Sequence, residues 1–102
     1  MLSYNIADVE RLPELWESMT AAWRAGDLPG LEEMFAQPMR ADFPAVNQTL
    51  LIDRNNAWIP QLEALAGSPE VEFVLVGALH LSGADGLLAQ LAARGYQITQ
   101  LP

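Results

Sequence analysis

The 102-residue sequence contains no cysteine and no lysine, and it has a single histidine, His80. The absence of cysteine excludes a disulfide framework, a thiolate zinc site and a cysteine nucleophile, and it leaves the redox compartment open. One histidine cannot hold a zinc or manganese ion alone, because such sites use three or more protein ligands. Any metal chemistry therefore needs ligands besides this histidine.

Long apolar runs are also missing. No stretch approaches the roughly 20 apolar residues that cross a bilayer. The first five residues, Met-Leu-Ser-Tyr-Asn, have neither the basic start nor the apolar middle of a signal peptide. We therefore expect no transmembrane segment and no signal peptide in this chain, and its localisation stays open.

Positive charge is scarce. Five arginines stand against thirteen acidic residues, which gives a formal net charge of −8. Such a charge repels phosphate backbones, so we expect no nucleic-acid partner and no binding to an anionic membrane surface. Hydrophobic residues make up 51% of the chain, which is enough for a core. We expect one domain, or a fragment of one, over residues 1–102, with a helical part at 1–66 and a second part at 67–102.

The amino-terminal part begins with an expected irregular lead-in over residues 1–12. Apolar residues at helical spacing then predict a helix over about 12–25, which starts near Pro13 and ends at Gly26. We expect Trp16 and Trp23 to face a core, with a ligand groove as the alternative.

A second helix is predicted over 28–37, with Asp27 as its N-cap. Residues 38–44 contain two prolines and no periodicity, which indicates an irregular connector and a hinge or internal boundary. A longer helix is predicted over about 45–66, kinked near Asn56 by Pro60.

Arg54 lies on the apolar face of that long helix, with Leu51, Trp58 and Leu62. It can extend its charged end over apolar surface, or pair with Asp53 or Glu63. Alternatively, the helix delivers its guanidinium into a functional site. Periodicity leaves both interpretations open.

The sequence pattern of residues 67–102 predicts a strand, a helix and a second strand. Residues 73–76 form a short apolar run typical of a buried strand, and residues 96–101 alternate with period two. Between them, Ser82 and Asp85 have capping-box spacing before a helix over about 84–94, which Gly95 ends. The expected fold class is α/β, with amino-terminal helices followed by a right-handed βαβ unit and a small parallel sheet. Because two strands make a poor sheet, we expect a missing amino-terminal portion of the same protein, or a homodimer, to complete it.

His80 follows the first predicted strand, which is where open α/β sheets usually place their sites. Its residue type suits a metal ligand or a hydrogen-bonded structural side chain equally well. Ser82, two residues later, is better explained as a cap than as a nucleophile.

The residues around His80 resemble a known family. Val76-Gly77-Ala78-Leu79-His80-Leu81, followed by Gly83-x-Asp85-Gly86, resembles the carboxyl-terminal signature of the TraB/GumN family. The tail from Leu91 through Gly95-Tyr96 to Ile98 is similar to that family's L-x-x-x-G-Y-x-V pattern. Arg54-Asn55, with Trp58 after it, is similar to an upstream Arg-Asn on a helix.

This resemblance implies a metal-dependent hydrolase, such as a peptidase, related to the Tiki membrane-linked metalloproteases. The family's proposed site uses two Gly-x-x-His motifs, a glutamate and an arginine. Carried over residue by residue, His80 is a metal ligand, and Arg54 and Asn55 are catalytic. The remaining matched positions are motif or structural residues: Gly77, Ser82, Gly83, Asp85, Gly86, Gly95 and Tyr96.

The other Gly-x-x-His motif has no counterpart, because the chain has no second histidine. The resemblance therefore implies a zinc or manganese cofactor that this chain does not hold alone, and an isolated chain without activity. Relatives are often extracytoplasmic. The alternative is a non-catalytic interaction module, in which the loop after Gly77 is a structural turn and His80 hydrogen-bonds backbone groups.

Overall fold

The computed structural model describes residues 10–102, so the signal-peptide prediction and most of the predicted lead-in lie outside the described residues. The described residues form α-helices, two π-helical segments (η1 and η2) and a 3-10 turn (η3). In chain order they are α2 (Leu12–Ala25), α3 (Leu28–Leu31), η1 (Glu32–Ala36), α4 (Gln37–Asp42), α5 (Pro44–Asn47), η2 (Gln48–Ile52), α6 (Asp53–Ala66), η3 (Ala78–His80) and α7 (Leu87–Ala93).

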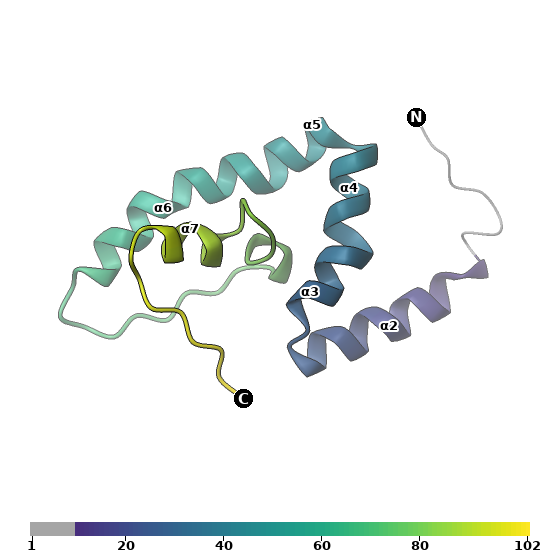
Figure 1. Cartoon of the computed structure of the whole chain (residues 1–102), viewed down its shortest axis with the longest axis horizontal. Helices are drawn as coiled ribbons and strands as arrows, with labels where there is room; N and C mark the ends of the chain where they lie inside the picture. Colours follow the sequence, from purple (N-terminus) through teal and green to yellow (C-terminus); the bar gives the residue numbers. More distant parts are fainter. Residues whose placement is uncertain (1–9) are drawn as a thin grey trace.

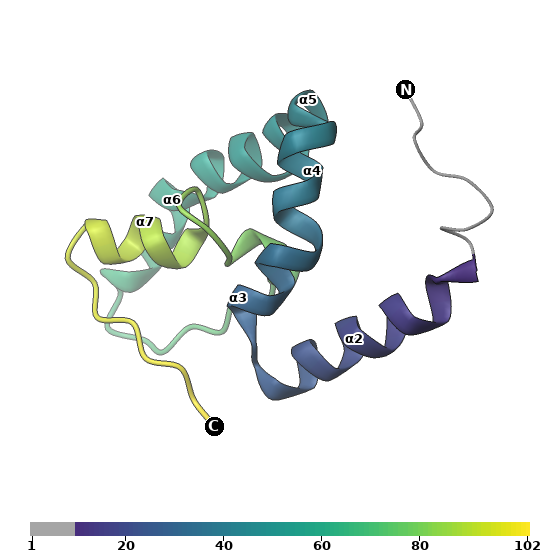
Figure 2. The ribbon, with the colours of Figure 1, turned by 45° about the vertical axis from the view of Figure 1, so that its right-hand side comes forward.

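These elements form three helical rods and a carboxyl-terminal segment that contains η3 and α7. The first rod is α2, the second runs from α3 through η1 to α4, and the third runs from α5 through η2 to α6 (Figure 1). Both views show α7 beside α6, while α2 projects away from them (Figure 2). The radius of gyration is 15.8 Å, against about 13 Å for a compact domain of this length. The chain is therefore more open than an ordinary domain.

The predicted first helix is confirmed. Its proline lies in the first turn, and Gly26 follows the last turn with φ 69°. The N–H of Asp27 donates to the Ala22 carbonyl at 2.8 Å, which closes the helix end in a Schellman arrangement. The predicted N-cap is also confirmed, because Asp27 Oδ1 accepts a hydrogen bond from the Gly30 N–H at 3.0 Å.

The predicted irregular connector at 38–44 is wrong. The second rod continues to Asp42 and breaks only at Phe43, which has φ −135° and ψ 62°. Proline lacks an N–H and normally interrupts a helix. Here the chain widens to π-helix just before Pro38, and the Gln37 N–H donates five residues back to Glu32. This wider turn lets the helix pass the proline.

The long third helix is confirmed as three consecutive helical segments, and Pro60 lies inside α6. The predicted apolar face is only half-buried, however, at Leu51, Trp58 and Leu62. The buried residues of this rod are Asn47, Asn55 and Ile59, whereas Val46, Leu50 and Leu65 are exposed. The rod therefore presents two asparagines and one isoleucine inward.

The predicted α/β fold is wrong. No residue from 10 to 102 lies in a strand, and both predicted strands are open coil between or after helices (Figure 1). A strand exists only where a neighbouring backbone accepts and donates its ladder of hydrogen bonds. No backbone–backbone hydrogen bond joins 71–76 or 97–102 to another described residue. The right-handed βαβ unit and its parallel sheet are therefore absent from the described part of the chain.

The helix between the two coils starts later than predicted. It begins at Leu87 with Gly86 at its N-cap, and no side chain caps it, so the predicted capping box of Ser82 and Asp85 is wrong. The predicted stop at Gly95 is confirmed. Its φ is 93°, and the Tyr96 N–H donates to the Leu91 carbonyl at 3.1 Å.

The core of the described chain is small. Its buried apolar residues are Ala22, Leu31, Ala36, Ile59 and Leu87. The prediction that both α2 tryptophans face a core is wrong, since Trp16 is 67% and Trp23 64% exposed. Of the helices that the structure describes, none has the length and apolar character to cross a membrane.

Candidate functional site

Asn55 lies at the centre of the candidate site. It is the most deeply buried large side chain of the described residues, at 2% exposure, and it lies on α6. Its Nδ2 donates to the carbonyl oxygens of His80 at 3.2 Å and Asp85 at 3.0 Å. One amide group therefore fixes both ends of the loop 80–86.

The same amide fixes the protonation of the His80 ring. Asn55 Oδ1 lies 2.8 Å from His80 Nδ1. Because both Nδ2 hydrogens point to carbonyl oxygens, Oδ1 can only accept, so Nδ1 is the donor. In the neutral ring Nε2 then has the free lone pair. No hydrogen bond from a described side chain or backbone group engages Nε2.

Arg54 and Trp58 border the histidine on the same helix. The Trp58 and His80 ring centroids are 4.8 Å apart, and the Arg54 guanidinium carbon lies 5.2 Å from the Trp58 ring centroid. The three side chains line one cavity of about 440 Å³ with Gln61, Leu62, Leu65, Val74, Leu75, Val76, Gly77 and Leu87. Helix α6 thus supplies a cation, an aromatic ring and the ring-orienting amide next to His80.

The suggested pairing of Arg54 with Asp53 or Glu63 is not found. Among the described residues, Glu63 pairs with Arg94 at 3.3 Å, and Asp53 accepts from Gln48 at 2.7 Å. The cation–π contact with Trp58 holds Arg54 over the ring.

Burial lowers the pKa of His80 below its ordinary value, and the positive charge of Arg54 lowers it further. Both effects disfavour the imidazolium. The neutral ring, with its Nε2 lone pair free, is therefore favoured over the imidazolium.

Two glycines shape the loop after His80. A Cβ at Gly86 would lie 2.4 Å from the Ser82 carbonyl oxygen and 2.5 Å from that of Leu81, so a side chain is excluded there. Gly83 has φ 76°, a conformation that favours glycine. By contrast, Gly77 has an ordinary φ of −64°, and a Cβ there would meet only His80 Cδ2 at 3.7 Å. The Gly77 carbonyl accepts from the His80 N–H at 3.0 Å and so starts η3.

A second, half-buried cluster, from the second rod, lies against the other side of this loop. Glu32 forms an ion pair with Arg40 and lies against Gly83. The Ser82 hydroxyl donates to the Leu79 carbonyl oxygen at 3.2 Å. Glu32 Oε2 is buried and accepts no hydrogen bond from a described residue. Burial raises the pKa of Glu32, but the hydrogen bond from Arg40 and the positive charge of Arg40 outweigh it and bring the pKa below its ordinary value.

Sequence reasoning did not find Glu32, Arg40 or Gln90 as loop contacts. Gln90 Nε2 donates to the Asp85 carbonyl at 2.9 Å and to Asn56 Oδ1 at 3.2 Å. These residues lie on helix faces of no unusual composition, and their partners are far away in sequence. The spacing of eight between Glu32 and Arg40 gave no signal, because Arg40 lies in the segment predicted to be an irregular connector.

The structure brings Arg54, Asn55 and His80 together, as well as Gly77. Asp85 takes part through its backbone carbonyl. Gly95 and Tyr96 lie at the far end of α7 and do not line the His80 cavity.

The donor set of the described residues does not fit a zinc or manganese ion. His80 offers one nitrogen, and residues 10–102 contain no group of three or more histidine, cysteine, aspartate or glutamate side chains that could hold a metal. The nearest cation-bearing side chain, Arg54, adds positive charge where a metal would need negative ligands.

The model of the TraB/PrgY/gumN family matches residues 1–100. The chain belongs to this family. The resemblance to TraB/GumN proteins inferred from the Gly-x-x-His and Gly-Tyr motifs is thereby confirmed. No curated protein and no solved structure matches the chain.

Proposed function

We propose that this member of the TraB/PrgY/gumN family contributes part of a metal-dependent hydrolytic centre, with a peptide as one candidate substrate. In this proposal His80 Nε2 is one ligand nitrogen, and Arg54 supplies positive charge for a developing oxyanion. The observation that supports it is the bond from His80 Nδ1 to Asn55 Oδ1 at 2.8 Å. Histidines that bind metals usually donate their other ring N–H to an oxygen acceptor, which orients the ring.

Asn55 acts in this proposal as a positioning residue. Its side chain is buried, and it does not line the cavity that Arg54 and His80 share. It sets the tautomer of His80 and fixes the loop backbone at both ends. The contribution of Asn55 is therefore the orientation of a neighbouring group, and it makes no contact with a substrate.

The centre needs ligands from elsewhere, because the described residues do not fit a metal site. We propose that they come from an amino-terminal portion of the same protein or from a second copy. The chain alone is expected to be inactive.

A chelated metal ion tests whether the Nε2 atom of His80 is accessible to a metal. Cu²⁺ held by iminodiacetate has open positions that one accessible imidazole can fill, and His80 is the only histidine. We expect the chain to bind this complex, with the shift of the copper absorption band as readout, and His80→Ala to lose binding. Arg54→Ala should retain it. Failure of the wild-type chain to bind would show that Nε2 is not available and would favour a non-catalytic module.

A titration with free metal ions tests whether the metal site needs ligands from outside this chain. In a calorimetric titration with Zn²⁺ or Mn²⁺, we expect no micromolar binding by the chain. Micromolar binding of one ion per chain, lost in His80→Ala, would contradict the claim that further ligands are required.

A further inference from the structure

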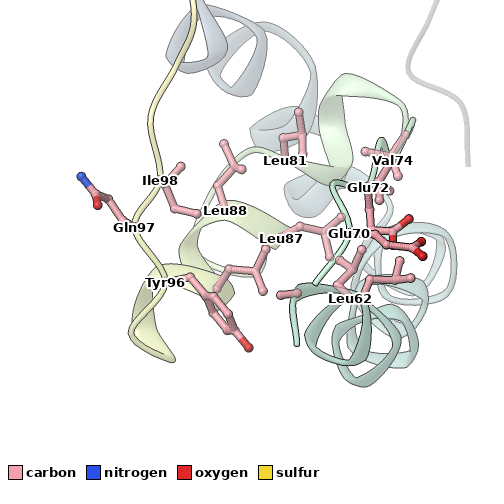
Figure 3. Close-up of a pocket in the computed structure, with 14 residues that line it drawn as sticks. Leu62, Glu70, Glu72, Val74, Leu81, Leu87, Leu88, Tyr96, Gln97 and Ile98 are labelled. Atoms are coloured by element: carbon pink, nitrogen blue, oxygen red, sulfur yellow. The ribbon is translucent and has the colours of Figure 1, made fainter. Parts of the chain in front are cut away.

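A second cavity lies on the side of α6 and α7 that the two coil segments cross. Its volume is about 380 Å³, and Figure 3 shows Glu70, Glu72 and Val74 on one side, with Tyr96, Gln97 and Ile98 on the other. Between them the floor is formed by leucines of both helices: Leu62, Leu65, Leu87, Leu88 and Leu91. We call this cavity the interstrand groove.

The segment 70–76 has the alternation of a strand. Every second residue lines the interstrand groove: Glu70, Glu72, Val74 and Val76. The residues between them point away and are almost fully exposed, with Val71 at 100%, Phe73 at 90% and Leu75 at 84%. This period of two is that of an extended backbone with two distinct faces.

Both walls have free backbone groups. No backbone–backbone hydrogen bond joins 71–76 or 97–102 to another described residue, although the side chains of both segments line the same groove. Unpaired backbone donors and acceptors beside β-branched and aromatic side chains are a template for an added strand. Such additions bind through main-chain hydrogen bonds and place alternate side chains into pockets.

We propose that the interstrand groove receives an extended strand of a partner polypeptide that is apolar in its centre and basic at an end. The strand pairs with 71–76, and its inward side chains cover the leucines of α6 and α7. Its basic end meets Glu70 and Glu72, because no arginine lines this groove to neutralise them.

A second copy of the chain does not fit this requirement. The chain has no lysine, and neither 71–77 nor 96–102 contains an arginine. Its own segments would bring Glu72 or uncharged residues to the acidic wall, and two chains of net charge −8 repel each other. The charges therefore favour a basic strand from a different polypeptide.

This inference does not require the proposed hydrolytic centre. Neither His80 nor Arg54 lines the interstrand groove. The groove borders the His80 cavity, and both are lined by Leu62, Leu65, Val74, Val76 and Leu87. The variant His80→Ala should bind the strand as the wild type does, so failure of one proposal leaves the other intact.

A fluorescent peptide of sequence Lys-Val-Thr-Val-Thr-Val-Lys is the probe, measured by anisotropy at low salt against the whole chain. We expect saturable binding, and at least about tenfold weaker binding of the same peptide with its three valines N-methylated, because the main-chain hydrogen bonds of these N–H groups are lost. A peptide with glutamate in place of both lysines should bind several-fold more weakly, and the difference should shrink at high salt.

Two variants locate the binding. Val74→Pro removes a backbone N–H that makes no bond within the described chain, so we expect it to fold and to lose peptide binding. Glu70→Gln with Glu72→Gln should remove the preference for lysine. Val46→Lys, on exposed α5 surface, is the matched control and should bind as the wild type.

Several results would overturn the proposal. Equal binding of the N-methylated peptide would exclude strand pairing, and equal binding of the glutamate peptide would exclude a basic partner. Absence of binding would exclude the groove as a strand site. A stable dimer in sedimentation that Val74→Pro dissociates would assign the groove to a second copy.

Discussion

Two neighbouring regions of the chain differ in how their backbone groups are satisfied. The backbone carbonyls of the loop 80–86 accept hydrogen bonds from Asn55 on α6 and Gln90 on α7. The coils 71–76 and 97–102 have no backbone–backbone hydrogen bonds to described residues and expose large apolar side chains. Local order around His80 is therefore independent of the sheet that the sequence predicts.

This difference separates two roles. A loop fixed by a buried amide group can orient one functional side chain. The open coils instead retain the hydrogen-bonding capacity of strands without a partner. Their apolar side chains are available for a surface that covers them.

The largest expected contrast is between two leucines. Leu87 at the start of α7 is 3% exposed, whereas Leu75 in the coil is 84% exposed. We expect Leu87→Ala to lower the free energy of unfolding by about 3 kcal/mol, through lost burial and a cavity. Leu75→Ala should change it by less than about 0.5 kcal/mol. Urea denaturation followed by tryptophan fluorescence measures both, and equal losses would show that the coil is packed.

The next contrast is between adjacent asparagines of α6. Asn55→Ala leaves two loop carbonyls and His80 Nδ1 without their partner, so we expect a loss of about 2–3 kcal/mol. Asn56→Ala removes one exposed hydrogen bond from Gln90, and should cost less than about 0.5 kcal/mol. A similar, small loss in both variants would contradict the assignment of Asn55 as the residue that fixes the loop.

A third contrast concerns glycines. An added Cβ at Gly86 would meet two carbonyl oxygens within 2.5 Å, whereas at Gly67 the nearest atoms are 3.6 and 3.7 Å away. We expect Gly86→Ala to cost about 2 kcal/mol. Gly67→Ala, at φ −79°, should be neutral or stabilising by up to about 1 kcal/mol. Thermal unfolding of the two variants gives the comparison, and a Gly86→Ala protein as stable as wild type would show that the loop is not tightly held.

The smallest expected effect is a dependence of stability on pH. The pKa of His80 is lowered on folding, so the unfolded chain binds more protons, and stability should fall as the pH drops through about 6.5 towards the folded pKa. The lowered pKa of Glu32 predicts a further loss below about pH 4.5. Urea midpoints between pH 8 and pH 3 measure both steps. His80→Gln should abolish the first step and keep the second; persistence of the first step would assign it to another group.

Local chemistry made parts of the fold predictable. Pro13 and Gly26 fixed the ends of α2, Asp27 capped the second rod, and Gly95 ended α7 because its φ of 93° suits glycine. The strands could not be predicted correctly from pattern alone. A strand depends on a partner far away in sequence, and the described chain supplies none.

The candidate site also has features that could be predicted from the sequence and features that could not. The motif residues His80 and Arg54 were recognised from a family resemblance, and they do line one cavity. The burial of Asn55 could not be predicted. Its neighbours at helical spacing, Leu51, Trp58 and Leu62, are apolar, and an asparagine is not expected to be buried on such a face. An asparagine lies on the buried face because its amide satisfies two loop carbonyls and a ring nitrogen, which no aliphatic side chain can do.

The tautomer of His80 tests the central claim most directly. Nitrogen-15 NMR of the histidine ring, in protein labelled at both ring nitrogens and held near pH 8, distinguishes protonated Nδ1 from protonated Nε2. The structure predicts a proton on Nδ1 and a free lone pair on Nε2, with the preference lost in Asn55→Ala. A ring protonated on Nε2 in the wild-type protein would contradict the account.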